Sequence, residues 1–131
     1  GAAVKFAASE DFNELRKKVT GVLRDMGRLS YFELTEAAKE LENFKDLTDV
    51  TDMIYMWYRD VLVYKTTGSD RTVIQKDMVS AVRAEAERVS FDGLYRVPPL
   101  IMETKKQIKQ NVNFVFALEM LFINIKGELS E

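Results

Sequence analysis

The stretch Val50-Thr-Asp-Met-Ile-Tyr-Met-Trp-Tyr-Arg-Asp-Val-Leu-Val-Tyr64 decides the fold, because its side chains are apolar on nearly every side of a helix. One helical face carries Val50, Met53, Ile54, Trp57, Val61 and Tyr64, and much of the opposite face carries Tyr55, Met56, Leu62 and Val63. A helix that is apolar nearly all round is a central one, covered by other helices. We expect it to start near Thr48 or Asp49 and to end before Gly68.

A second strongly apolar stretch lies near the end of the chain. It predicts a last helix from Phe114 to about Lys126 that stops at Gly127. Its large side chains exceed what one helix face can bury, and an exposed apolar patch usually marks an interface. The candidate interface residues are Phe116, Met120 and Ile123 of this helix, together with Tyr58 of the central helix. The other aromatic residues of the central helix are expected in the core.

Cap signals place the remaining helices around these two. The first full helix is expected to begin at the N-cap Ser9 and to end at Gly27, and the second to begin at Ser30 with Glu33 at capping-box spacing. A fourth helix is expected over about 71–89. A fifth is expected from Ser90 to Gln110, kinked or split by Pro98 and Pro99, followed by a break between Asn111 and Asn113. The predicted fold is a single all-α bundle of about five to six helices.

Composition limits the chemistry of this bundle. The 131 residues are 47% hydrophobic and 31% charged, which suits one domain with a real core. Cysteine and histidine are absent, so disulfides, the usual zinc sites and catalysis by His or Cys are excluded. We expect no cofactor, no metal site and no catalytic residue. No apolar run is long enough to cross a bilayer and no secretory signal is visible. The absence of cysteine fits a cytoplasmic location.

Charge argues against nucleic-acid binding. The formal net charge is −2, from 19 basic and 21 acidic side chains, whereas a phosphate grip needs a basic stripe. The chain has two basic clusters, one formed by Lys105, Lys106 and Lys109 and the other by Arg16, Lys17 and Lys18. Acidic residues lie close to both, Glu103 near the first cluster and Glu10 and Glu14 near the second. We interpret both clusters as solvated helix faces, one of which could still meet an acidic surface of a partner.

Two charged residues sit in the most apolar segments. Arg59 and Glu119 each have apolar or aromatic neighbours three and four residues away in both directions. Burying such a charge alone costs several kcal/mol, so we expect the two helices to pack together and Arg59 to meet Glu119 as an ion pair. Asp60, in a similar position, is expected to join that network or to cap a loop. The functional alternative makes Glu119 a general acid and Arg59 a binding residue for an anion.

The same residues carry a family resemblance. The segment Trp57-Tyr-Arg-Asp-Val-Leu62, followed by Asn111-Val-Asn113 and Ala117-Leu-Glu119, resembles the C-terminal domain of delta-prime subunits of the bacterial DNA polymerase III clamp loader. The resemblance covers essentially the whole chain. Its combination of W-Y-R-D with N-V-N and A-L-E is fairly specific, whereas either half alone is weak. The pair Pro98-Pro99 departs from relatives, which usually have an uninterrupted helix there.

The resemblance implies a non-catalytic role in assembly. Residues 1–8 would be the remnant of the junction with an upstream lid domain, and residues 9–131 a collar domain for oligomerisation. Collar domains of five subunits pack side by side into a ring, so the implied partners are tau/gamma-type and delta subunits, with no direct contact to nucleic acid or membrane. The phosphate-binding loop G-x-x-x-x-G-K-[ST] of an ATPase is absent from this chain. A sister subunit with the same collar architecture is the nearest alternative within the family.

Two other functions compete with this interpretation. A small all-α enzyme would bring Arg59, Lys105 and Glu119 together in a water-accessible pocket for an anionic substrate. A helical nucleic-acid binder would concentrate its basic residues on one face.

Overall fold

The computed structural model describes residues 2–44 and 47–130, and the side-chain burial of residues 10–44 and 50–130. This part of the chain contains no strand and forms an all-α bundle, as predicted. The helices are α1 (Ala2–Arg24), α2 (Tyr31–Leu41), α3 (Leu47–Thr67), α4 (Val79–Arg88), α5 (Phe91–Lys109) and α6 (Phe114–Leu129). Two short 3-10 turns, η1 (Asp70–Thr72) and η2 (Lys76–Met78), connect α3 to α4.

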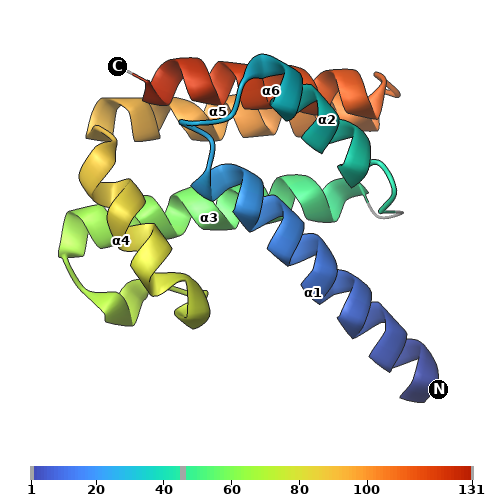
Figure 1. The fold of residues 1–131 in the computed structure, drawn as a ribbon, viewed down its shortest axis with the longest axis horizontal. Helices are drawn as coiled ribbons and strands as arrows, with labels where there is room; N and C mark the ends of the chain where they lie inside the picture. Colours follow the sequence, from blue (N-terminus) through green and yellow to red (C-terminus); the bar gives the residue numbers. More distant parts are fainter. Residues whose placement is uncertain (1, 45–46, 131) are drawn as a thin grey trace.

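α3 is the central helix of the bundle. It packs against α1, α4 and α5, while α6 packs against α2 and α5 (Figure 1). Val50, Ile54, Trp57 and Val61 are fully buried, which confirms the central position that their spacing predicts. The opposite face of α3 is covered only in part, because Tyr55 is exposed and Leu62 and Val63 are half-buried.

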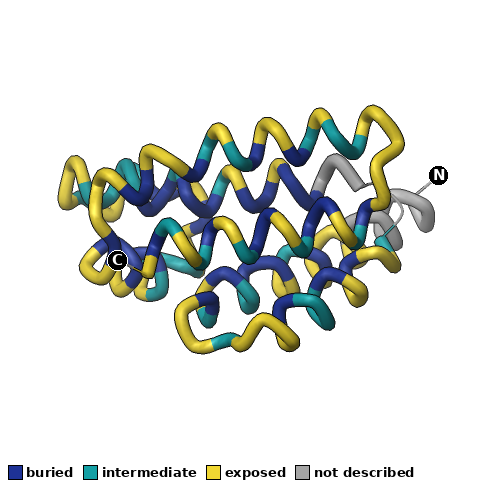
Figure 2. Tube along the Cα trace, turned by 90° about the horizontal axis from the view of Figure 1, so that it is seen from above, coloured by how far each residue is buried: buried dark blue, intermediate teal, exposed yellow. Residues whose placement is uncertain are grey.

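Buried and exposed residues alternate along the described helices (Figure 2), and the buried ones are mostly apolar. α6 contributes Leu118, Leu121, Phe122 and Ile125 to the same core that contains Trp57. α1 is the exception along part of its length. Among the residues whose burial is described, 10–14 are all exposed and Leu15 is the first buried one, and the N-terminal part of the helix runs out of the bundle (Figure 1).

The helix boundaries follow the predicted caps at several places. Ser30 and Glu33 form the complete capping box, and Ser90 accepts a hydrogen bond from the N–H of Gly93 at 3.0 Å. Asn113 caps α6 by accepting from the N–H of Phe116 at 2.9 Å. Asn111 has a φ of 65°, a left-handed conformation that ends α5 and that Asn tolerates better than most residues.

Two predicted boundaries are wrong. α1 begins at Ala2 and not at Ser9. The segment before Ser9 is rich in alanine, the residue type with the highest helix propensity, and it extends the helix toward the N-terminus. α6 runs to Leu129 through Gly127, which lies inside the helix with open space where a Cβ would stand.

α5 is also not split by its two prolines. Pro98 and Pro99 lie inside one continuous helix, although each lacks the N–H that would bond to the carbonyl four residues earlier. Buried residues on both sides of the pair, Leu94, Val97 and Ile101, share one face. Their packing against α3 and α6 holds the two halves in line.

Candidate functional site

Asp60 is the centre of a buried hydrogen-bond cluster. Its fully buried carboxylate accepts from the backbone N–H of Ile74 at 3.0 Å and from that of Gln75 at 3.2 Å. Arg59 donates to the same carboxylate at 2.8 Å and to the carbonyl of Thr72 at 3.1 Å. Asp60 therefore fixes the segment between α3 and α4, which is one of the two roles that the sequence indicates.

This cluster also explains why the observed fourth helix is shorter than the predicted one. The N–H groups of Ile74 and Gln75 bond to a side chain of α3 and not along a helix, and Val73 is extended, with a ψ of 122°. The expected helix over 71–89 is replaced by η1, η2 and the ten-residue α4.

The expected pair of Arg59 and Glu119 is not formed. The carboxylate of Glu119 accepts from the hydroxyl of Thr35 in α2 at 2.9 Å, and Arg59 bonds to Asp60 and Thr72. The reason lies in the packing, since the main neighbours of α6 are α2 and α5 whereas α3 packs against α1, α4 and α5. Arg59 also needs no deep partner, because its side chain is 38% exposed.

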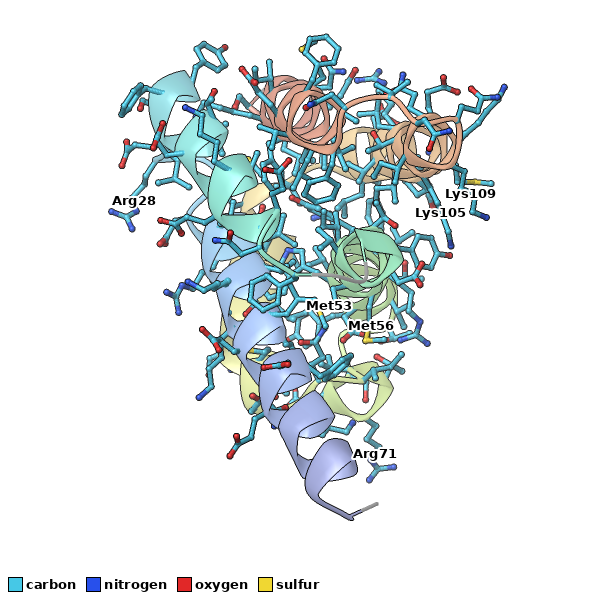
Figure 3. The ribbon with its side chains drawn as sticks, turned by 90° about the vertical axis from the view of Figure 1, so that its right-hand side faces the viewer. Arg28, Met53, Met56, Arg71, Lys105 and Lys109 are labelled. Atoms are coloured by element: carbon cyan, nitrogen blue, oxygen red, sulfur yellow. The ribbon has the colours of Figure 1, made fainter. Side chains whose placement is uncertain are left out.

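The residues of the enzyme alternative are likewise separate. Lys105 of α5 forms an ion pair with Asp52 of α3 at 3.0 Å, and it lies near Lys109 of the same helix (Figure 3). Arg59, Lys105 and Glu119 thus each have a different partner. Within the described residues, no group of three or more His, Cys, Asp or Glu side chains could hold a metal ion.

A second buried polar site lies between α3 and α4 and was not predicted. Glu85 is only 4% exposed and forms an ion pair with Arg88 one turn later. Burial raises the pKa of Glu85, and the neighbouring Arg88 opposes this shift in part. The signal in the sequence is weak, because an acid and a base three residues apart are common on solvated helices.

Tyr58 belongs to this buried site and not to a surface. It is 2% exposed, and its hydroxyl has no hydrogen-bond partner in the described residues, as is also true of the indole N–H of Trp57. Burial, followed by the nearby charge of Glu85, raises the pKa of Tyr58 far above its usual value. The prediction that Tyr58 reaches an interface is therefore wrong, since α4 covers that side of α3.

The remaining candidate interface residues form one surface stripe on α6. Phe116 is 57% exposed, Met120 is 38% exposed and Ile123 is half-buried. Spacings of four and three residues place them on the same side of the helix, opposite its core residues. We call these three residues the α6 patch.

The position of the α6 patch is fixed by polar contacts to the neighbouring helices. Lys126 donates to the carbonyls of Met26 and Gly27 after α1, at 3.2 and 3.1 Å, while Thr35 of α2 holds Glu119. On the other side, Arg96 of α5 pairs with Glu128 at 3.3 Å. The apolar stripe is thus presented by a helix held from both sides.

A further set of exposed apolar residues lies on α5. Phe91 stacks on Tyr95 with ring centroids 6.4 Å apart, and Met102 is exposed two turns further along. Lys65 lies over the ring of Phe91, 5.0 Å from its centroid. Spacings of four and seven residues place these three side chains on one side of α5.

Comparison with known proteins gives one match. The family model for "DNA polymerase III, delta subunit, C terminal" matches residues 10–127. Neither the curated proteins nor the solved structures gave a match. No helix of the described residues is long and apolar enough to cross a membrane. Because the family model covers nearly all of the described bundle, the chain belongs to the family of C-terminal domains of the DNA polymerase III delta subunit, a clamp-loader family.

Proposed function

We propose that this bundle is the collar domain of a delta-prime-type clamp-loader subunit, and that it joins tau/gamma-type and delta subunits into one assembly. Residues 1–8 would then be the end of an upstream lid domain, and residues 9–131 the oligomerisation domain. Such a domain works in the cytoplasm and catalyses nothing itself. Delta C-terminal domains are in general not catalytic.

The observation that carries the proposal is the α6 patch. Large apolar side chains exposed together on one helix are typical of protein interfaces, where aromatic residues and Met are enriched. The family supports a clamp-loader partner for this surface. The delta-prime assignment rests on the resemblance carried by Trp57-Tyr-Arg-Asp60 and by the segments around Asn111 and Glu119.

The small-enzyme alternative has no comparable support. It needs Arg59, Lys105 and Glu119 in one pocket, and each of them is held by a different partner.

The proposal is tested by placing charges in the patch. The variant Phe116→Glu/Met120→Glu is mixed with purified tau and delta subunits of the same organism, and the complex is measured by size-exclusion chromatography with light scattering. The unaltered chain is expected to join a larger complex, and the variant is expected to remain free while keeping its helical circular dichroism.

Ile74→Glu is the matched control, because Ile74 is also an exposed apolar residue but lies in the segment between α3 and α4. It should assemble like the unaltered chain. Normal assembly of the α6 variant, or failure of the unaltered chain to bind either subunit, would contradict the proposal.

A further inference from the structure

A groove of about 410 Å³ runs between α1 and α2. Its floor is apolar and comes from both helices, with Gly21 and Val22 on one side and Ala37 and Leu41 on the other. Phe32, which is 73% exposed, also lines the groove. The groove shares no residue with the α6 patch.

Gly21 keeps the floor of this groove open. It lies in the interior of α1, where glycine costs about 1 kcal/mol of stability relative to alanine. A Cβ at this position would meet nothing within 4 Å, so nothing in the described chain requires a glycine there. The missing side chain leaves space in the floor of the groove that a side chain from outside the chain could occupy.

The two edges of the groove carry opposite charges. Lys17 and Lys18 line it from α1, and Glu36 and Glu40 line it from α2. Asp25, directly after α1, also lines the groove, but its charge is paired with Arg28 at 2.9 Å. Among the described residues no ion pair joins the two edges. Glu36 pairs with Lys39 on its own helix at 3.1 Å, and the side chains of Lys17, Lys18 and Glu40 form no ion pair in this part of the chain.

We propose that the groove binds an amphipathic α-helix of a partner protein. The apolar side of that helix would lie over Gly21, Val22 and Ala37, its acidic side chains beside Lys17 and Lys18, and its basic side chains beside Glu36 and Glu40. Docking of an apolar helix side into a groove between helices is a recurring mode of recognition, and charges along both edges fix the direction of the bound helix.

Other ligands fit this groove less well. Sites for small molecules enclose most of the ligand surface, whereas this groove is open along its length. A nucleic acid would bring its phosphates close to the acidic wall formed by Glu33, Glu36 and Glu40. A helix with both signs of charge matches both edges at once.

The test uses the 131-residue chain and three labelled synthetic peptides of about 18 residues, enough for five helical turns. All three carry leucines at spacings of three and four. The matched peptide has Glu on one flank of the leucine stripe and Lys on the other, and the two control peptides have only Glu or only Lys on both flanks. Binding is measured by fluorescence anisotropy at low and at physiological salt.

The matched peptide is expected to bind about ten-fold more tightly than either control, because each control replaces attractive pairs on one edge by repulsive ones. The Gly21→Leu variant should fill the groove and weaken binding of the matched peptide at least ten-fold. It should also unfold at the same or a higher denaturant concentration, so its loss of binding cannot be due to a damaged fold.

Gly127→Leu is the control variant, because it also replaces a helical glycine that has open space at its Cβ, but on α6. It should bind the matched peptide normally, as should Phe116→Glu in the α6 patch. The proposal is overturned if no peptide binds, if all three bind equally, or if Gly21→Leu binds as the unaltered chain does. Tight binding of a DNA or RNA oligonucleotide that is lost in Lys17→Glu/Lys18→Glu would overturn it in favour of a phosphate site.

Discussion

Asp60 fixes the connection from α3 to α4 with a single carboxylate. Its removal leaves two buried backbone N–H groups and the guanidinium of Arg59 without their acceptor. We expect Asp60→Ala to lower the free energy of unfolding by about 3 kcal/mol or more, the cost typical of breaking a buried charged network. Urea denaturation followed by circular dichroism measures this change.

Glu119→Ala is the comparison for that measurement. Glu119 is only partly buried and accepts a hydrogen bond from Thr35, so its loss should cost about 1 kcal/mol or less. Similar costs for the two variants would show that Asp60 does not organise the segment between α3 and α4.

Glu85 predicts a dependence of stability on pH. Burial raises its pKa in the folded state above the usual value of 4.5, so the folded chain binds more protons than the unfolded chain just above that pH. The contribution of Glu85 to stability must then fall as pH rises from about 4.5 towards the raised pKa. Glu85→Gln removes the titrating group, so its stability should decrease less than that of the unaltered chain over this range.

Urea denaturation at several pH values between 4 and 8 measures the free energy of unfolding of both proteins. The effects of the other titrating groups are common to both proteins and cancel in the difference. Asp25, Glu33 and Asp77 have lowered pKa values, held down by contacts to Arg28, Ser30 and Arg16 respectively. Their contribution has the opposite sign, because the stability that these groups provide is lost as pH falls below their usual pKa values. Identical slopes for both proteins would contradict the buried position of Glu85.

The charged residues also show how far a sequence can be interpreted. Apolar neighbours at helical spacing correctly marked Asp60 as a buried charge that needs partners. They did not identify the partners of Arg59 and Glu119, because those depend on which helices pack together. Tyr58 was placed on a surface for the same reason, since its spacing does not reveal that α4 covers it.

At the scale of the helix, α5 tolerates two consecutive prolines because tertiary packing compensates for two missing backbone hydrogen bonds. Pro99 is exposed, so its ring contributes little to the core. We expect Pro99→Ala to raise the free energy of unfolding by about 1–2 kcal/mol. The substitution restores a hydrogen-bond donor to the carbonyl of Tyr95, and this gain exceeds the stability that proline contributes by restricting the unfolded chain.

Thermal denaturation of Pro99→Ala measures this gain, with Gln110→Ala at the end of the same helix as a control that should change little. A loss of stability in Pro99→Ala would mean that the proline ring makes packing contacts that outweigh the missing hydrogen bond.

Three local cap signals were predicted correctly, whereas the start at Ser9, the stop at Gly127 and the helix controlled by a distant residue were not. The capping residues Ser30, Ser90 and Asn113 each lie three residues before the N–H that they bind. The 3-10 turns before α4 depend on Asp60, which lies 14 residues before Ile74 in the sequence. No local pattern in residues 71–78 contains that information.

At the scale of the whole molecule, α1 is packed along only part of its length. Residues 10–14 are exposed, whereas Val19 and Leu23 are fully buried. Helical hydrogen bonds without tertiary cover open easily, so we expect amide exchange at Asn13 to be about a hundred-fold or more faster than at Leu23. Hydrogen exchange followed by NMR tests this expectation, and equal protection along α1 would contradict it.

The all-α architecture and the outward apolar side of α6 were both accessible from hydrophobic spacing, because spacing determines how much of a helix can be buried. The groove between α1 and α2 was not, although Lys17, Lys18 and Gly21 are plain in the sequence. A groove depends on the angle at which two helices separate, and side-chain periodicity does not specify that angle.

The partly covered α1 has a mechanical consequence. From Leu15 back to Glu10 the exposed stretch of the helix is about 7–8 Å long at a rise of roughly 1.5 Å per residue, while Lys126 ties the opposite end of α1 to α6. A bend at Leu15 would therefore move this stretch while the packed part of the helix stayed in place.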